Sequence, residues 1–250
     1  MIFITGDTHG DWMKRLKVES FPEQKEMTKN DYVIILGDFG IWDDSKREAY
    51  NLDWLENRPF TTLFVSGNHE NYDILDNLPI EEWHEGKVNF IRPSVIHLTR
   101  GQVFNIQDKT FFAFGGASSH DISAGILEPD DPLFKEKKRM LDKDPFALYR
   151  INHVSWWERE LPNEEEIKNG LDNLKKENNK VDYIITHSPS TSELYLMGGK
   201  GLYQSDILTN YLEEIKANTE YKRHFFGHMH WDKAINDKDV CLYEQIVRIL

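Results

Sequence analysis

The sequence predicts an α/β fold built on a largely parallel β-sheet. Three short apolar runs of strand length occur before residue 70, and each is followed by a glycine and a polar loop. Helix-like segments separate the runs, as expected for successive β-α-β units. The chain has 250 residues, of which 39% are hydrophobic, and this is enough to bury a large core. It has no visible internal repeat or low-complexity linker, so we expect a single domain over residues 1–250.

The first part of the chain alternates strands and helices. We expect strands over residues 2–4, 32–36 and 62–65, because each run is almost wholly apolar and β-favouring. Helices are expected over 11–21, where a proline ends the pattern, and over 46–56. The carboxyl ends of parallel strands meet at one edge of a sheet, so the loops after these strands should lie together.

The middle of the chain has a different pattern. Short β-favouring runs at 88–91, 95–98, 102–106 and 110–114 predict antiparallel strands, which could form a second sheet packed on the first. Residues 128–144 are charged and interrupted by prolines. We expect a surface loop there that contains some helix and could act as a lid.

The last part returns to strands that end in polar loops. Asn163 with Glu166 resembles a capping box and should open a helix that runs to about residue 178. Strand-like runs at 181–186 and 224–226 then lead into a Thr-His segment and a Gly-His-Met-His segment. Residues 234–249 should add strands at the C-terminus.

Composition and charge restrict the class of protein. Forty-three acidic residues against 30 basic ones leave a formal charge of −13, which opposes general binding to nucleic acid. No apolar run approaches the roughly 20 residues that would cross a membrane, and no secretion signal is visible at the N-terminus. The single cysteine, Cys241, cannot form an internal disulfide. We therefore expect a cytoplasmic protein, and the sequence does not predict its oligomeric state.

Polar side chains follow the predicted strands at their carboxyl ends. These residues are Asp7, His9, Asp38, Asn68, His69, His187, His228 and His230. Carboxylate, imidazole and amide ligands without cysteine suit Mn, Fe, Zn or Ni ions better than a thiolate zinc site. Eight such residues exceed the needs of one ion, so the set indicates two ions, about 3.5–4 Å apart. One carboxylate must bridge them, and Asp38 on the central strand is the best candidate.

Each of these residues also has an ordinary explanation. A lone histidine near a strand is usually a hydrogen-bonding residue, and we interpret His97 and His153 in that way. Asn68 by itself could be a turn residue. The metal interpretation rests on the recurrence of the pattern. Five successive strand-like runs end in a group of this kind, and packing offers no reason for it.

Five segments occur in the order in which calcineurin-like metallophosphoesterases carry their motifs, and the chain therefore resembles that family. The segments are Gly6-Asp7-Thr8-His9-Gly10, Gly37-Asp38, Gly67-Asn68-His69-Glu70, Thr186-His187 and Gly227-His228-Met229-His230. They extend from residue 6 to residue 230, which is nearly the whole chain. The resemblance implies a four-layer α/β/β/α sandwich of two mixed β-sheets flanked by helices, with a dinuclear metal site at the sheet edge.

The resemblance also implies a role for each motif residue. One metal ion would be held by Asp7, His9 and His230, and the second by Asn68, His187 and His228, with Asp38 as the bridge. The nucleophile would be a hydroxide bound to the metal ions. His69 would not be a ligand but would protonate the leaving oxygen or stabilise the transition state.

The chain departs from the family members that act as protein phosphatases. Those carry Gly-Asp-x-Val-Asp-Arg-Gly, but here Ile41 and Trp42 stand at the positions of the second Asp and the Arg. Ser66 replaces a further arginine, so two phosphate-clamping arginines are missing. The carboxylate partner of the catalytic histidine is missing too, unless Asp43 or Asp44 reaches it.

The expected function is metal-dependent hydrolysis of phosphate esters, with phosphomonoesters favoured. The alternatives are a phosphodiesterase acting on cyclic nucleotides, dinucleotides or nucleic acid, and a non-catalytic metal-binding scaffold. Binding to a membrane is not expected, and nucleic acid is disfavoured as a partner by the acidic charge. Candidate substrate contacts are Lys200 in a glycine-rich loop, and Ser118 and His120 in the loop after residue 114.

Overall fold

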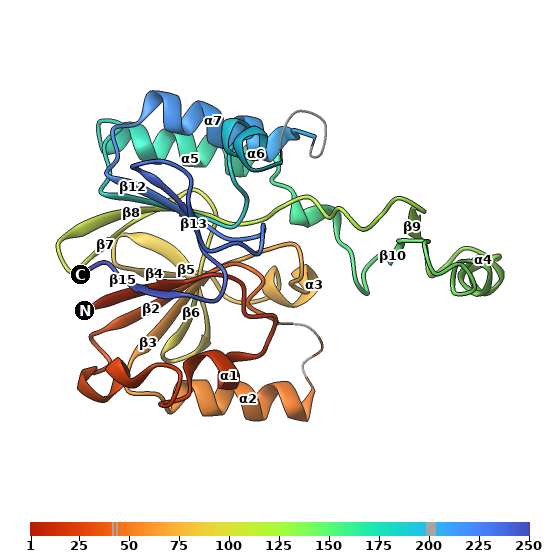
Figure 1. Ribbon diagram of the computed structural model, residues 1–250, viewed down its shortest axis with the longest axis horizontal. Helices are drawn as coiled ribbons and strands as arrows, with labels where there is room; N and C mark the ends of the chain where they lie inside the picture. Colours follow the sequence, from red (N-terminus) through yellow and green to blue (C-terminus); the bar gives the residue numbers. More distant parts are fainter. Residues whose placement is uncertain (42, 44, 199–203) are drawn as a thin grey trace.

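The computed structural model describes residues 1–41, 43, 45–198 and 204–250. Two large sheets pack face to face, and helices cover both outer faces (Figure 1). The predicted four-layer arrangement of two mixed sheets flanked by helices is confirmed. Among the described residues, no helix has both the length and the apolar character needed to span a membrane.

The first sheet contains seven strands in the order β15-β1-β2-β3-β6-β5-β4. They are β1 (Ile2–Thr5), β2 (Tyr32–Leu36), β3 (Thr61–Val65), β4 (Glu81–Trp83), β5 (Gly86–Arg92), β6 (Val95–Leu98) and β15 (Ile246–Arg248). The strands β1, β2, β3 and β6 are parallel, with Ile4, Ile34, Leu63 and Ile96 in register. These central strands are buried on both faces, which explains their continuous apolar sequences.

The second sheet contains six strands in the order β13-β14-β12-β11-β8-β7. They are β7 (Gln102–Ile106), β8 (Lys109–Phe114), β11 (Tyr183–Thr186), β12 (Arg223–Phe226), β13 (Lys233–Ala234) and β14 (Asp239–Cys241). The strands β8, β11, β12 and β14 are parallel to one another. The carboxyl ends of β11 and β12 therefore lie at one edge, as those of β1, β2 and β3 do in the first sheet.

The helices form the two outer layers. They are α1 (Trp12–Leu16), α2 (Lys46–Glu56), α3 (Tyr72–Leu75), α4 (Phe134–Leu141), α5 (Glu164–Lys176), α6 (Thr191–Gly198) and α7 (Ile207–Asn218). Helices α1 and α2 pack on the first sheet, and α5 and α7 pack on the second. The predicted capping box is present, because Asn163 and Glu166 each accept a backbone hydrogen bond from the other at the start of α5.

Two expectations about local structure were wrong. The helix predicted over residues 11–21 ends at Leu16, because the backbone turns to an extended conformation at Lys17, and Pro22 opens a separate 3₁₀ helix (Pro22–Glu26). The four middle strands do not form one sheet. Strands β5 and β6 join the first sheet, and β7 and β8 join the second, with Gly101 (φ 74°) in the connection between β6 and β7.

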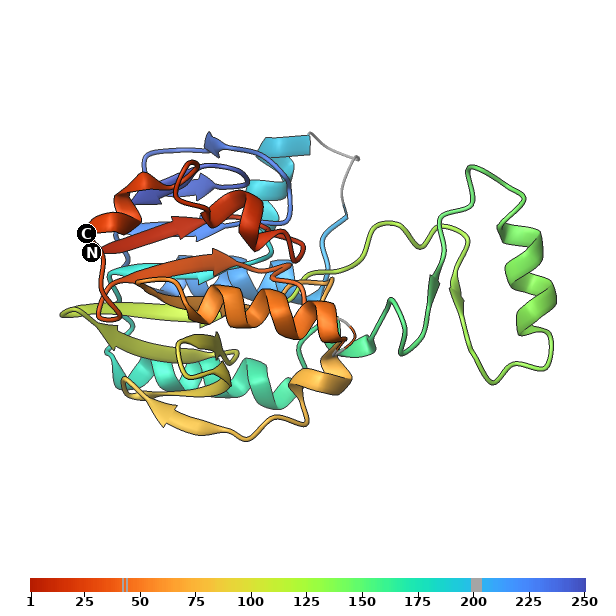
Figure 2. The same ribbon diagram turned by 90° about the horizontal axis from the view of Figure 1, so that it is seen from below.

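Residues 121–155 form an arm that projects from the body of the molecule (Figures 1 and 2). It contains β9 (Ile126–Leu127), helix α4 at its outer end and β10 (Arg150–Ile151), which pairs with β9. The expectation of a surface segment with some helix over residues 128–144 is confirmed. The arm leaves the body at the edge where the carboxyl ends of the central strands lie.

Phe64 on β3 tests the packing between the first sheet and its helices. Its side chain is fully buried and stacks on Phe39 at 4.0 Å between ring centroids and on His97 at 5.0 Å. Phe64→Ala should lower the free energy of unfolding by about 3–5 kcal/mol, because it removes apolar contacts and leaves a cavity. Urea denaturation followed by circular dichroism measures this change. Tyr50→Ala, at a position on α2 that is 67% exposed, is the control and should change stability by less than about 0.5 kcal/mol.

Candidate metal centre

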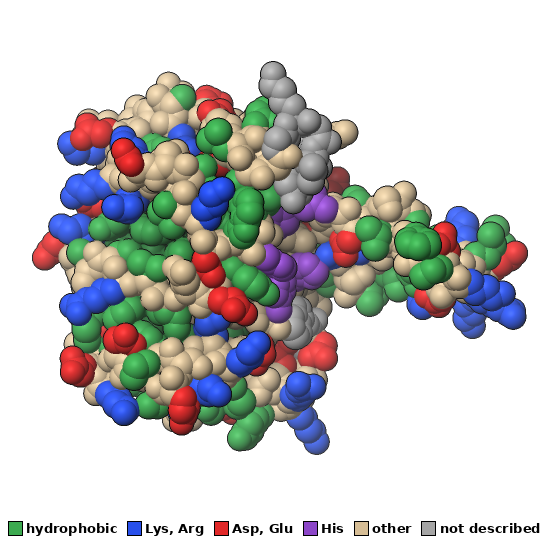
Figure 3. Space-filling model, viewed as in Figure 1, with side chains coloured by type: hydrophobic (Ala, Val, Ile, Leu, Met, Phe, Trp, Pro, Cys, Tyr) green, Lys and Arg blue, Asp and Glu red, His purple; other side chains and the backbone are tan. Residues whose placement is uncertain are grey.

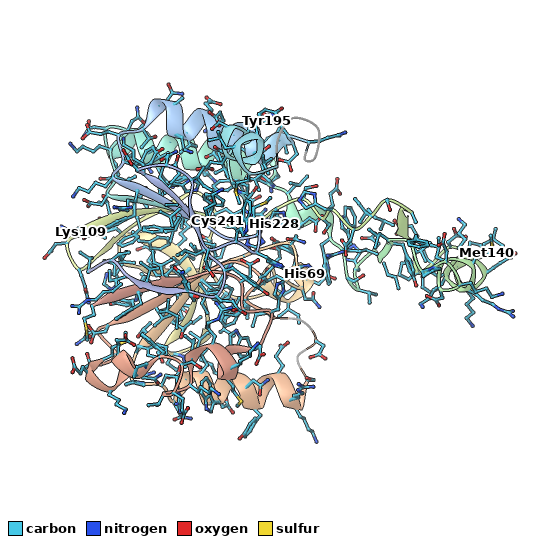
Figure 4. The ribbon with its side chains drawn as sticks, in the orientation of Figure 1. His69, Lys109, Met140, Tyr195, His228 and Cys241 are labelled. Carbon is cyan, nitrogen blue, oxygen red and sulfur yellow. The ribbon has the colours of Figure 1, made fainter. Side chains whose placement is uncertain are left out.

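Five loops bring the candidate ligands to one edge of the two sheets. Asp7 and His9 follow β1, Asp38 follows β2, and Asn68 and His69 follow β3. The second sheet contributes His187 after β11, and His228 and His230 after β12. Histidine side chains gather on the surface where the arm meets the body (Figure 3), and His69 and His228 lie at this edge (Figure 4).

The first group of ligands consists of Asp7, His9, Asp38 and His230. One ligand atom from each lies within 4.8 Å of the others. The Nε2 atoms of His9 and His230 are 3.1 Å apart, and His230 Nε2 is also 3.1 Å from Asp7 Oδ2. These donors converge on a volume that one ion would fill.

The second group shares Asp38 and adds Asn68, His187 and His228. His187 Nε2 lies 3.4 Å from Asp38 Oδ1 and 3.3 Å from Asn68 Oδ1. The other ring nitrogen of His187, Nδ1, donates to the carbonyl oxygen of Leu36 at 2.7 Å, which orients the ring so that Nε2 faces Asp38 and Asn68 as a metal ligand would. The His228 ring packs against that of His187 at 4.9 Å. Asp38 therefore contacts both groups, as a bridging ligand must.

The donor set fits two metal ions. Asp7, Asp38, Asn68 and His187 are at most 4% exposed, and buried carboxylates at this density require compensating positive charge. Asp7 Oδ2 is buried and accepts no hydrogen bond of good geometry. Mixed carboxylate, imidazole and amide oxygen donors suit Mn, Fe, Zn or Ni.

Several candidate ligands have a strained backbone conformation. His9, Asp38, His228 and His230 have φ angles of 47°, 42°, 63° and 50°, in the left-handed region that non-glycine residues rarely adopt. Each such conformation costs about 1–3 kcal/mol and persists only where the surrounding structure enforces it. Strain at four of the seven candidate ligands supports a functional role for these loops.

Glycines give the carboxylates the space they occupy. A Cβ atom at Gly67 would lie 2.1 Å from Asp38 Oδ1, and one at Gly227 would lie 2.3 Å from Asp7 Oδ1. Backbone groups hold the same oxygens, because His69 N donates to Asp38 Oδ1 at 2.9 Å and His228 N donates to Asp7 Oδ1 at 3.0 Å. The recurring glycines of the motifs are thus required by close approach.

Glu70 joins two of the loops, although sequence reasoning assigned it no role. Its buried carboxylate accepts hydrogen bonds from the backbone N–H groups of Phe39 and Gly40 after β2, and of Gly67 after β3. Burial, with a contribution from the charge of Asp38, raises the pKa of Glu70 to about 8. The residue therefore fixes the position of the Asp38 loop relative to the Asn68 loop.

The structure places an arginine beside His69 that the sequence motifs did not predict. Arg150, on β10 at the root of the arm, has its Nη2 atom 3.0 Å from His69 Nε2 and its side chain only 6% exposed. Asp121 accepts from Arg150 Nε at 2.6 Å and orients the guanidinium. Burial lowers the pKa of His69; Asp38 opposes this shift and Arg150 adds to it. Arg150 belongs to no short motif, so no sequence signal pointed to it.

The loop after β8 forms another wall of the site. His120 Nε2 lies 2.9 Å from His228 Nε2, so this candidate substrate contact is close to the second ligand group. The structure places Ser119, rather than Ser118, against Asn68: Asn68 Nδ2 donates to Ser119 Oγ at 3.3 Å. Ser119 Oγ in turn donates to Glu160 at 2.7 Å. Asn68 is thereby held by a buried chain of hydrogen bonds.

Three further residues were candidates for substrate binding or for pairing with His69. Lys200 and Asp44 lie outside the described residues. Asp43 Oδ1 accepts a hydrogen bond from the backbone N–H of Ser45 at 3.0 Å, so the partner of this oxygen is a neighbouring residue of its own loop.

A second group of possible metal ligands has its charge satisfied by a lysine. Glu193 on α6, His224 on β12 and Asp239 on β14 are buried together. Lys216 Nζ lies 2.6 Å from Glu193 and 2.9 Å from Asp239, and it occupies the position that a cation would take. We interpret this cluster as a buried ion-pair network.

The chain is similar to known proteins over most of its length. A family model described as calcineurin-like phosphoesterase matches residues 1–232. No curated protein sequence matches the chain. A solved structure of a phosphopantetheinyl hydrolase from Mycobacterium tuberculosis is similar, with 14% identity, coverage of 96% of this chain and 89% of that chain, and a TM-score of 0.40.

Gly67→Ala tests whether the close approach at Asp38 is needed for metal binding. The added methyl group must displace the Asp38 carboxylate or the backbone, so bound Mn should fall well below that of the unchanged protein while circular dichroism still reports a folded chain. Metal content after dialysis against Mn²⁺ is the measurement. Gly125→Ala is the control for backbone strain without a steric clash, because Gly125 has a φ of 96° and a Cβ there meets no atom within 4 Å. Equal Mn content in both variants would contradict the assignment of Asp38 as a metal ligand.

Proposed function

Because the chain belongs to the calcineurin-like phosphoesterase family, we propose that it is a phosphatase that hydrolyses phosphate monoesters in preference to diesters. The family consists of metal-dependent hydrolases with a dinuclear metal centre, and the chain has a matching cluster of carboxylates and imidazoles. The family supports the reaction class. The preference for monoesters rests on the surroundings of His69.

Arg150 is the observation that favours monoesters. Its guanidinium places a positive charge 3.0 Å from the ring of His69, at the root of the arm. A monoester phosphoryl group has one more unsubstituted oxygen and one more negative charge than a diester. The Arg150 guanidinium already donates from Nε to Asp121 and from Nη1 to the carbonyl oxygen of Ser155, so its advantage with a monoester is electrostatic. The extra negative charge of the monoester strengthens the attraction. Arg150 would thus replace, from another part of the chain, the arginines that are absent at Trp42 and Ser66.

The proposed assignment gives each residue one role. Asp7, His9 and His230 hold one metal ion, Asn68, His187 and His228 hold the other, and Asp38 bridges them. When bound, the ions activate a water molecule and offset the charge of the phosphate; Mn, Fe, Zn or Ni would serve. His69 donates a proton to the leaving oxygen or stabilises the charge that develops on it. Arg150 orients His69 and binds the phosphoryl oxygens.

The first test compares p-nitrophenyl phosphate with bis(p-nitrophenyl) phosphate, with and without added Mn²⁺. We expect Mn²⁺-dependent hydrolysis, with a higher kcat/KM for the monoester. Asp38→Asn and His69→Asn should each reduce kcat by about 100-fold or more while the fold survives, because one loses the bridging charge and the other the proton donor. Higher kcat/KM for the diester would move the function to a phosphodiesterase. Retained activity in both variants would contradict the proposed mechanism.

Arg150→Gln tests the origin of the substrate preference. Loss of a charged hydrogen bond to the phosphoryl group should raise KM for the monoester by about tenfold or more and change KM for the diester less. Metal content should stay unchanged, because Arg150 holds no ion. Arg92→Gln removes an arginine that pairs with Asp53 on the surface and is the matched control. An equal loss on both substrates would show that Arg150 acts only through the position of His69.

A further inference from the structure

The arm has little burial of its own. Of the eight residues in α4, all of them described, none is buried. The ion pairs of α4, between Lys137 and Asp131 and between Lys138 and Asp142, stay within the arm. Its two strands pair over only two residues each. An isolated hairpin or helix of this length is marginally stable in water, so the arm needs a further packing surface.

The arm also exposes large apolar side chains. Among the described residues, eleven such side chains are strongly exposed, and five of them lie in the arm: Leu133 (54%), Met140 (66%), Phe146 (86%), Leu148 (49%) and Val154 (63%). The arm is a small fraction of the chain, so this density is high. Figure 4 labels Met140 at the outer end of the arm. A patch of this kind on a protein surface marks an interaction site.

The charge of the arm's outer end is opposite to that of the chain. Residues 133–143 contain five basic side chains and two acidic ones, a net charge of +3. Because the whole chain carries a formal charge of −13, the other 239 residues carry −16. Basic side chains are visible around α4 in Figure 3. The basic character belongs to α4 and not to the arm as a whole, because over residues 121–155 seven acidic and six basic side chains leave a net charge of −1. The acidic body of the same chain is the electrostatic complement of α4.

We propose that the arm is a dimerisation element, and that α4 with its exposed apolar side chains docks on the body of a second copy of this chain. A second copy supplies the acidic surface that α4 requires. In a two-fold symmetric pair each arm would dock on the other body, so both apolar surfaces are buried in one closed arrangement.

The receiving surface is the apolar patch formed by Tyr195, Leu196 and Ile207. These side chains are 45%, 66% and 52% exposed. They lie at α6 and at the start of α7, on the side of the body from which the arm projects (Figures 1 and 2). Asp206 and Glu214 add acidic groups to the same segment of chain. Two copies that face each other on this side would bring each arm to the patch of the other.

Sedimentation velocity of the full chain at increasing concentration tests the proposal. The expected result is a reversible species of twice the 29.5 kDa chain mass, which weakens as salt is added because basic and acidic surfaces meet. The double variant Met140→Asp, Phe146→Asp should weaken dimerisation by about tenfold or more, since both side chains would be buried in the contact.

The matched control is Tyr50→Asp. Tyr50 is 67% exposed, like Met140, but lies on α2 outside the arm and the receiving patch. This variant should dimerise like the unchanged chain. A chain that stays monomeric at every concentration would overturn the proposal, and so would a double variant that dimerises as the unchanged chain does.

Cross-linking tests which surfaces meet. The native cysteine, Cys241, is buried, so a bismaleimide should react only with introduced cysteines. A mixture of two chains, one with Met140→Cys and the other with Leu196→Cys, should give a cross-linked pair that contains one of each. The unchanged chain should give none. Pairs formed only between two Met140→Cys chains would mean that the arms meet each other, and would overturn the assignment of the patch.

Discussion

The site depends on buried carboxylates that accept backbone hydrogen bonds from loops other than their own. Glu70 binds the loops after β2 and β3 together through Phe39, Gly40 and Gly67. Asp7 accepts from the backbone of His228, which joins the first sheet to the second. Direct backbone hydrogen bonds add to these contacts, because His9 N donates to the carbonyl oxygen of Asp38 and Gly227 N donates to that of His187. The relative placement of the ligands follows from them.

This arrangement explains why glycines and strained residues occur in the loops of the site. A carboxylate that approaches backbone N–H groups closely leaves no room for a Cβ atom, so Gly67 and Gly227 stand where side chains would collide with Asp38 and Asp7. The sharp loops that return toward the site place His9 and Asp38 in left-handed conformations. The energy for this strain comes from the packed sheets beneath, since strained sites persist only on a rigid scaffold.

The arm gives the site a wall that the sheets cannot provide. Its root carries Arg150 against His69, and the loop that leads into it carries Ser119 against Asn68 and His120 against His228. Helix α4 at the outer end of the same arm is basic, and the arm exposes large apolar side chains. One inserted segment therefore connects the surroundings of the reacting group with the surface that we assign to a second copy of the chain.

The sequence by itself determined most of the strands, the order of the motif loops, the family and the candidate ligand set, but not the short strands β4, β9 and β10. Each of these is encoded locally, because an apolar run and the glycine and ligand that follow it lie within about ten residues. The capping box of α5 was predictable for the same reason. Helix α1 was overestimated, since local periodicity did not reveal the extended turn at Lys17.

Only the tertiary structure decided which distant segments meet. The runs at β6 and β7 are both short and β-favouring in sequence. Strand β6 joins the first sheet because it pairs with β3, and β7 joins the second because it pairs with β8. The contact of Arg150 with His69 joins residues 81 positions apart, and Ser119 reaches Asn68 across 51. Such contacts depend on how sheets pack and where an insertion returns. No periodicity or spacing within the chain encodes that geometry, because it arises from the packing of the whole molecule.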